Sequence, residues 1–587
     1  MVLKTSVGPY FKEHADHPKE GGTDMKKLSA LLALLIALTA FPAFSLALAE
    51  ERTYEQTLFD QSQPIEIDIQ MDDEAWNSMI ADASSEEFSA CNLVVNGVLY
   101  ENVAIRPKGN SSRLTVSNQG SERFSWRIKF DKYEKKRTCD GLDVLILNNG
   151  FKDPGELREA IAYDMYAFLD ADASLYNYAI VYHNGEYFGT YLALEGVDKS
   201  FAKRNYGDEY GKLYKPDSAD MNKRDKEQDN TDDDDEKNTG FGPSFGGRAN
   251  QGDDSGFGGS FGGRADAGDG NGFPGAPTDG GDSGFEPSSG APAMPTQDGT
   301  ADGQFPARPT GGFNFAMPGM GGGAKSDSDL AMALNYVGDD LGTYQEIWDS
   351  AKFKSGDEDH ARVVEALKHV CQGDGIADYL DVDNVLKYFA IQTFIYNHDG
   401  LTGTVSHNYY LYEQDGKLNL IPWDMNEAFT VSSDGSDYVN FPIDTPFTVT
   451  DLSERSFFMA LLADEECLAK YHEYLRILSE EYALGGGLEA AYERIRGQID
   501  ALVETDPTAF STYEQYTSAA ESLKTAIELR AQGVLGQLNG EIPSTREGQE
   551  AEPDKLLDTS GADLSGLTGG YGTGKMTFTM PNMPGKR

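Results

Sequence analysis

Two acids and one amide lie close together in residues 394–429, which read FIYNHDGLTGTVSHNYYLYEQDGKLNLIPWDMNEAF. They are Asp399, Asn408 and Asp424. The turn pair Asp415-Gly416 lies between two apolar runs and predicts a β-hairpin, which would fold Asp424 back towards Asn408 and Asp399. An acid beside a hydroxyl group, together with an acid and an amide on a divalent cation, is the minimum set for phosphoryl transfer.

A basic segment lies far upstream, in the sequence AIRPKGNSS at residues 104–112. It contains Arg106, Lys108 and Asn110, and it follows a strand-like run. Gly109 would let backbone N–H groups approach an anion, and Lys108 would add positive charge. The segment is therefore a candidate phosphate-binding loop. An ordinary turn with an exposed lysine is the alternative.

These segments occur in an order that resembles the spore-coat CotH protein kinase family, whose members are atypical kinases with a protein-kinase-like core. The resemblance covers most of the chain from Glu50 to about Gly540, apart from one insert. It rests on the following stretches: AIRPKGNSS at 104–112, FSWRIKFDKY at 124–133, LILNN at 145–149, LRE at 157–159, YHNGEYFGTYLALE at 182–195, LYK at 213–215, HNYYLY at 407–412 and IPWDMNEAF at 421–429.

The resemblance implies roles for the first three residues. Asp399 would orient the acceptor hydroxyl and is a candidate to deprotonate it. Asp424 and Asn408 would hold Mg²⁺ or Mn²⁺ on the phosphates of ATP, because magnesium prefers hard oxygen ligands and few protein carboxylates. In the alternative interpretation Asp399 caps a loop and Asn408 bonds the backbone at the start of a strand.

Three further charged residues complete the expected nucleotide site. Lys129 lies in mid-strand, where protein kinases place their ATP lysine. Lys215 is a further phosphate candidate, and the sequence does not decide between Lys108 and Lys129. Glu195 ends a strand and could pair with one of these lysines, or it could cap a helix that follows.

The overall charge restricts the partners. The formal net charge is −48 and the pI is about 4.4, which argues against binding nucleic acid or anionic lipid. A basic, Ser-rich protein substrate would be attracted, although solubility alone is a simpler reason for the acidity. The four cysteines form no C-x-x-C pair, so a structural zinc site is not expected, and disulfides or free thiols both remain open.

The N-terminus predicts export. Residues 25–49 have two lysines, an apolar run and a small-x-small cleavage site, as in a signal peptide cleaved before Glu50, which leaves no stable membrane span. Residues 1–24 fit no signal, so we interpret them as a mis-assigned leader with Met25 as the start. N-terminal sequencing that finds His14 in the mature protein would contradict this.

The remaining composition divides the chain. Residues 50–216 and 328–540 are expected to form the two parts of one α+β domain with the bilobal fold of an atypical protein kinase: a strand-rich N-lobe and a helical C-lobe. Residues 217–327 are Gly-, Asp- and Phe-rich and predict a disordered insert, a possible contact for a cell-wall or coat partner. Residues 541–587 predict a disordered tail.

Two functions therefore compete. The first is an exported kinase that transfers the γ-phosphate of ATP to Ser or Thr of a protein. The second is a surface or cell-wall-associated structural or binding protein that kept the fold without turnover. The usual glycine after the metal-binding segment is absent, because Glu427-Ala428-Phe429 follows. A secreted glycan-binding protein or hydrolase has no supporting motif.

Overall fold

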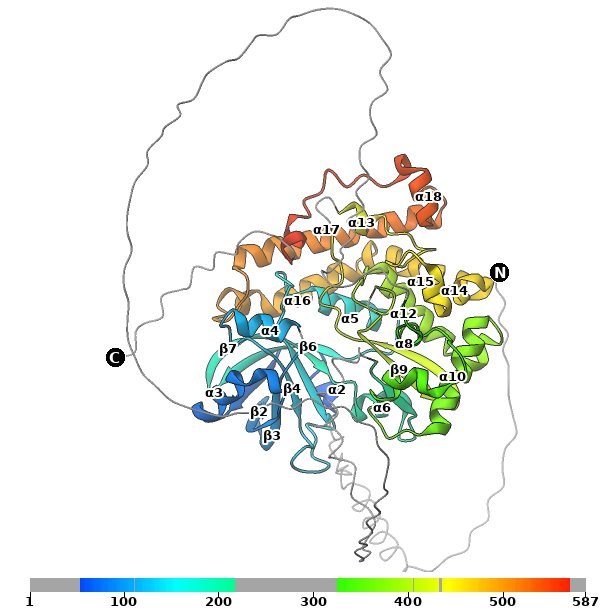
Figure 1. Ribbon diagram of the computed structural model, residues 1–587. Helices are drawn as coiled ribbons and strands as arrows, with labels where there is room; N and C mark the ends of the chain where they lie inside the picture. The colour runs from blue at the N-terminus through cyan, green and yellow to red at the C-terminus, as the bar shows by residue number, and fades with distance from the viewer. Residues whose placement is uncertain (1–52, 110, 217–324, 405, 432–434, 571–587) are drawn as a thin grey trace, which may run out of the picture. The chain divides into compact units, whose positions relative to one another are not determined.

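The computed structural model describes residues 53–109, 111–216, 325–404, 406–431 and 435–570. Within them the first part is strand-rich and the second helical, as the sequence predicts (Figure 1). The expected leader and signal peptide, nearly all of the low-complexity insert and the end of the tail lie outside the described residues.

The N-terminal strands close into a barrel in the order β1-β2-β3-β4-β5-β7-β6. Neighbours pair antiparallel except β1 and β6, which run parallel and close the barrel. Turns at Asn96-Gly97 and Asn184-Gly185 join β2 to β3 and β6 to β7, and all four residues have positive φ. The strands are β1 (Ile65–Gln70), β2 (Ser89–Val95), β3 (Val98–Lys108), β4 (Ser125–Lys129), β5 (Val144–Asn148), β6 (Tyr176–His183) and β7 (Glu186–Glu195).

Strand β5 is buried on both faces. Leu145 and Leu147 pack into the barrel interior, whereas Val144 and Ile146 belong to the hydrophobic cluster of the helical part. Successive side chains of a strand point to opposite faces, so the outer face of β5 is the wall that the helices cover. Arg127 of β4 pairs with Ile146 and lies on this same outer face.

The second part consists of a small sheet and a set of helices. Strands β8 (Lys212–Tyr214), β9 (Tyr409–Gln414) and β10 (Lys417–Pro422) form the sheet in the order β10-β9-β8. The longer helices are α5 (Arg158–Phe168), α6 (Lys199–Tyr206), α10 (Asp357–Gln372), α12 (Val382–Phe394), α14 (Ser456–Ala463), α15 (Glu465–Ile477), α16 (Gly487–Glu504) and α17 (Tyr513–Leu538). Three helices belong instead to the strand-rich part: α2 (Tyr54–Thr57), α3 (Asp73–Ala81) and α4 (Ser111–Asn118). The remaining helices are α8 (Asp327–Met332), α9 (Gln345–Trp348), α11 (Ile376–Tyr379), α13 (Ser436–Val439) and α18 (Arg546–Ala551).

The expectation of a disordered tail from Glu541 does not hold for residues 541–570. They contain α18 and a final short helical turn, and Leu564 and Leu567 are buried in the core cluster of the helical part. These two leucines anchor the segment to the core. Two apolar residues among many polar ones are too few to predict a packed segment from the sequence. All four cysteines are free. No helix in the described ranges is both long and apolar enough to cross a membrane.

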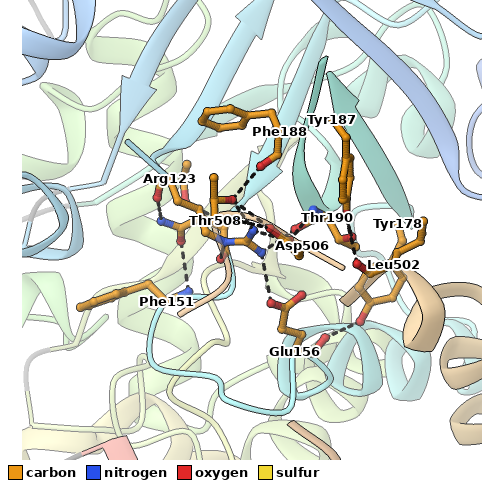
Figure 2. Close-up of polar contacts among 12 residues, drawn as sticks. Arg123, Phe151, Glu156, Tyr178, Tyr187, Phe188, Thr190, Leu502, Asp506 and Thr508 are labelled. Atoms are coloured by element: carbon orange, nitrogen blue, oxygen red, sulfur yellow. Dashed lines mark hydrogen bonds and ion pairs between the residues drawn. The ribbon is translucent and has the colours of Figure 1, made fainter. Parts of the chain in front are cut away.

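A buried guanidinium joins the barrel to the helical part (Figure 2). Arg123 is fully buried. Its Nη1 donates to Asp506 at 2.6 Å and Thr508 at 3.0 Å, just after α16. Its Nη2 donates to the Thr190 carbonyl of β7 at 2.6 Å and to Glu156 at 3.1 Å. Arg123 therefore fixes a barrel strand, the segment before α5 and the end of α16 at one point.

We expect Arg123→Met to lower the free energy of unfolding by about 3–5 kcal/mol, because it leaves buried carboxylates without their cation. Arg137→Met is the matched control: its pair with Glu134 is partly exposed, so its loss should cost about 1 kcal/mol or less. Urea unfolding of both variants is the measurement. A cost for Arg123→Met no larger than that of the control would contradict the role assigned to Arg123.

Candidate active site

A cavity of about 200 Å³ lies between the outer face of the barrel and the β9–β10 hairpin. Its charge balance differs from that of the chain, which has 97 acidic and 49 basic residues. Six basic side chains and seven acidic ones line the cavity. The basic set is Arg106, Lys108, Arg127, Lys152, Lys215 and Lys352, and the acidic set is Glu86, Asp153, Glu156, Glu159, Asp399, Asp424 and Glu427. The cavity therefore gathers cations in a strongly acidic protein.

Asp399, Asn408 and Asp424 all line this cavity. The predicted hairpin forms, with Tyr409 paired to Pro422. Asn408 immediately precedes β9 and Asp424 lies two residues after β10. The strand pairing therefore places Asp424 and Asn408 at the same end of the hairpin. The Asn408 Nδ2 donates to Asp399 Oδ2 at 3.0 Å and to the Asp399 carbonyl at 3.1 Å. The hairpin thus brings together three residues that are separated by up to 25 positions.

Asn408 and Asp424 both have left-handed backbone conformations, with φ of 59° and 54°. Asn and Asp tolerate this region better than other non-glycine residues do. Backbone conformations of this kind cluster at functional sites, where the surrounding structure holds them. Here the two residues flank the hairpin at the cavity.

The donor set suits a hard divalent cation whose other ligands come from a bound molecule. Because the Asn408 Nδ2 is used by Asp399, its Oδ1 is the amide atom left to accept, and Asp424 adds a carboxylate. Among the described residues, no group of three or more His, Cys, Asp or Glu side chains is arranged to hold a metal ion. Magnesium or manganese would therefore need further oxygens, and phosphates supply them in such sites.

Lys108 contributes the positive charge at the base of the cavity. Its Nζ donates to Asn148 Oδ1 at 2.6 Å and lies 5.4 Å from the centre of the Trp423 ring. Burial lowers the pKa of Lys108, while Asp424 and Glu159 oppose that shift. The lysine is thus held between the acid of the hairpin and an acid of α5.

Glu159 is the principal site residue that the sequence reasoning missed. It lies on α5, and its Oε2 accepts from Asn148 Nδ2 at 2.7 Å, so Asn148 links Lys108 to Glu159. Burial, with a contribution from Asp424, raises the pKa of Glu159 to about 7. Its signal in the sequence is a buried acid in the first turn of α5, between Arg158 and the apolar residues Ala160 and Ile161.

The other predicted residues divide between the cavity and its surroundings. Arg106 and Lys215 line the cavity, and Arg106 pairs with Glu86. Asn426, two residues after Asp424, also lines it. Asn110 lies outside the described residues.

Lys129 and Glu195 do not line the cavity. Lys129 shares the outer face of β4 with Arg127, but it pairs with Val144, one step further along the strands than the Arg127–Ile146 pair. Arg127 therefore reaches the cavity, whereas Lys129 is covered and is only 8% exposed. Glu195 is fully buried and accepts from Arg204 at 2.6 Å and from the Tyr54 hydroxyl at 2.6 Å. It pairs with an arginine of α6 and not with a predicted lysine.

Charge is closely balanced around Glu156, which lines the cavity. Burial raises the pKa of Glu156 from 4.5 to about 8, with Arg123 opposing the shift and Asp506 adding to it. Two carboxylates face one guanidinium, so full ionisation leaves an excess negative charge in buried surroundings.

We expect the free energy of unfolding to fall as pH rises from about 4.5 to about 8, because folded Glu156 keeps a proton that the unfolded chain loses. Glu156→Gln should remove this dependence, so the variant should gain on the parent by up to about 1.4 kcal/mol per pH unit in that window. Glu134→Gln, at an exposed position, is the control. Urea unfolding across the pH range is the measurement, and parallel curves for parent and Glu156→Gln would contradict the prediction.

Comparison with known proteins supplies the family. The family model described as CotH kinase protein matches residues 105–244 and 324–534, more than half of the 587 residues. The matched segments include Lys108, Glu159, Asp399, Asn408 and Asp424. A search of curated proteins found no match. The succession of segments and the extent of this match show that the chain belongs to the CotH kinase protein family.

Proposed function

We propose that this protein is an exported, ATP-dependent protein kinase that phosphorylates Ser or Thr of a protein substrate. The observation that carries the proposal is the convergence of Asp399, Asn408 and Asp424 on one cavity that also contains Lys108. An acid for the acceptor, an acid–amide pair for the metal and a lysine for the phosphates are the parts that phosphoryl transfer requires.

Each residue then has a defined task. Asp424 and Asn408 would hold Mg²⁺ or Mn²⁺, which neutralises charge on the phosphates of ATP. Asp399, fixed by Asn408 and 3.2 Å from His407 Nε2, would orient the acceptor hydroxyl. Positioning and charge stabilisation supply most of the rate in such a reaction. In this proposal the barrel and the helical part act as the two lobes of an atypical kinase fold.

Among the candidate lysines, the cavity geometry favours Lys108 as the main phosphate contact. Lys108 lines the cavity and is linked through Asn148 to Glu159, an arrangement comparable to the lysine–glutamate pair of protein kinases. Arg127 and Lys215 add positive charge to the same cavity. Lys129, one step further along β4, would stabilise the barrel wall.

The acceptor is proposed to be a basic, Ser-rich protein, which the net charge of −48 would attract. A surface or wall-associated binding protein without turnover is the second candidate. The observation that favours it is Glu427, which stands near the usual glycine position, lines the cavity and pairs with Lys152. Binding of metal and ATP without transfer would select this candidate.

Transfer of labelled phosphate from ATP to a basic, Ser-rich protein tests the proposal. With Mg²⁺ or Mn²⁺ we expect transfer by the parent, and a loss of about 100-fold or more in Asp424→Ala and Asp399→Asn, which remove the metal ligand and the acceptor-orienting acid. Asp415→Asn, an exposed change in the same hairpin, should retain full activity. Equal activity in all four proteins would contradict the assignment.

Another prediction distinguishes Lys108 from Lys129 as the main phosphate contact. Lys108→Met should lower kcat/KM by about 100-fold, because it removes the positive charge proposed to contact the phosphates. Lys129→Met should change kcat/KM by less than about threefold and act mainly on stability. Steady-state kinetics with varied ATP, with a thermal melt of each variant, make the comparison. The reverse ranking would assign the phosphate contact to Lys129.

A further inference from the structure

The last turn of α12 ends just before the segment that carries Asp399. The final carbonyl groups of any α-helix lack partners within the helix and need donors from elsewhere. In this protein the donors come from two remote places. Arg530 of α17 donates its Nη2 to the Thr393 carbonyl at 3.2 Å and its Nε to the Phe394 carbonyl at 3.4 Å. The Phe429 N–H donates to the Ile395 carbonyl at 2.8 Å.

These contacts connect both acids of the site. Phe429 lies five residues after Asp424, and Ile395 lies four residues before Asp399. The bond between them therefore ties the segment of the metal-binding acid to the segment of the acceptor-orienting acid. Arg530 secures the carbonyl groups immediately before Ile395, so a displacement of this helix end would move both acids relative to each other.

Arg530 also contacts a segment other than the end of α12, at residues 439–441. Its Nη1 donates to the Phe441 carbonyl at 2.7 Å and to the Val439 carbonyl at 3.2 Å. The side chain is fully buried, and its hydrogen-bond partners in the described part of the chain are all backbone carbonyls. The guanidinium thus supplies donors to carbonyl groups of two separate stretches, the end of α12 and residues 439–441.

Burial lowers the pKa of Arg530 to about 10, so the side chain remains charged near neutral pH. A buried charge costs several kcal/mol of desolvation, and apolar residues of similar volume are often at least as stabilising. Partners at a helix C-terminus offset part of this cost, because that end carries a partial negative charge. The cost makes simple packing a poor explanation for an arginine here.

A second buried arginine contacts the loop between α12 and β9, which carries Asp399. Arg455 is fully buried, and it donates to the carbonyl of Gly403, between Asp399 and Asn408. The loop is tightly folded at that point, since a Cβ on Gly403 would lie 1.7 Å from the His398 carbonyl oxygen. The loop is therefore held at its start by Arg530 and at its middle by Arg455.

We propose that Arg530 is a positioning residue, which sets the place of Asp399 relative to Asp424 by holding the end of α12. The inference rests on the proposed kinase function for its effect on rate. The guanidinium does not line the cavity, so its loss should impair the alignment of the reacting groups and leave ATP binding at the Lys108 side nearly unchanged.

Kinetics of the full chain test this with Arg530→Met, Arg530→Lys and the control Arg494→Met. Arg494 is a part-buried arginine away from the cavity lining, which pairs with Asp164 and donates to Gln61 at 2.5 Å and to the Tyr176 hydroxyl at 2.9 Å. We expect kcat per folded molecule to fall about 10- to 100-fold in Arg530→Met, with KM for ATP within about threefold, because small misplacements of reacting groups cost rate. Arg530→Lys should recover part of kcat, and Arg494→Met should keep it.

Hydrogen exchange measured by mass spectrometry gives a readout that does not need activity. In Arg530→Met, peptides covering 395–408 and 424–430 should exchange at least about tenfold faster than in the parent, while barrel peptides are unchanged. If Arg530→Met does not fold, Arg530→Lys decides by the same two measurements.

The outcomes are distinguishable. An active parent with unchanged kcat in Arg530→Met, or a loss equal to that in Arg494→Met, overturns the positioning role and leaves the proposed function standing. A parent without transfer overturns the proposed function, and the exchange data then decide whether Arg530 fixes the two segments. Unchanged exchange in both peptides overturns the inference in either case.

Discussion

The fully buried guanidinium of Arg123 is the interaction on which the arrangement of the site depends. It binds the Thr190 carbonyl of β7, Glu156 before α5 and Asp506 after α16, and it also donates to the Asn149 carbonyl at 2.8 Å. Asn149 and Glu156 bound the connection between β5 and α5, which forms one wall of the cavity. An arginine can do this because its five donors are fixed in one plane and stay charged when buried.

The same principle recurs around the cavity. Lys108 is half-buried between Asp424 and Glu159, and Arg530 is buried among carbonyl groups at the end of α12. Each cation has a desolvation cost that its partners must offset, and each connects segments that are distant in the sequence. The relative placement of Asp399 and Asp424 is therefore supported by charged groups on other segments of the chain.

The central part of the candidate site could be predicted from the sequence, because its residues are close together along the chain. Asp399, Asn408 and Asp424 lie in or beside one hairpin whose turn, Asp415-Gly416, is recognisable from the sequence. The strand-rich and helical parts, and membership of the CotH kinase protein family, were also predicted correctly. These features depend on short-range patterns or on ordered motifs.

The remainder depends on long-range pairing. Closure of the barrel requires β1 to pair with β6 more than 100 residues later, and no local signal specifies that partner. Lys129 and Arg127 are two positions apart on β4 and share one face, but only the register with β5 shows which of them reaches the cavity. In the sequence Glu159 and Arg530 look like ordinary helical residues. Their roles arise from contacts with Asn148, 11 positions away, and with Phe394, 136 positions away.

The central claim is that Asp424 and Asn408 hold a divalent cation on nucleotide phosphates, and anomalous X-ray scattering tests it most directly. Crystals of the protein grown with Mn²⁺ and a non-hydrolysable ATP analogue should show a manganese peak about 2.0–2.2 Å from oxygens of both side chains, with the phosphates towards Lys108. A manganese peak and a nucleotide elsewhere on the protein, or a cavity that binds neither at saturating concentrations, would contradict the account.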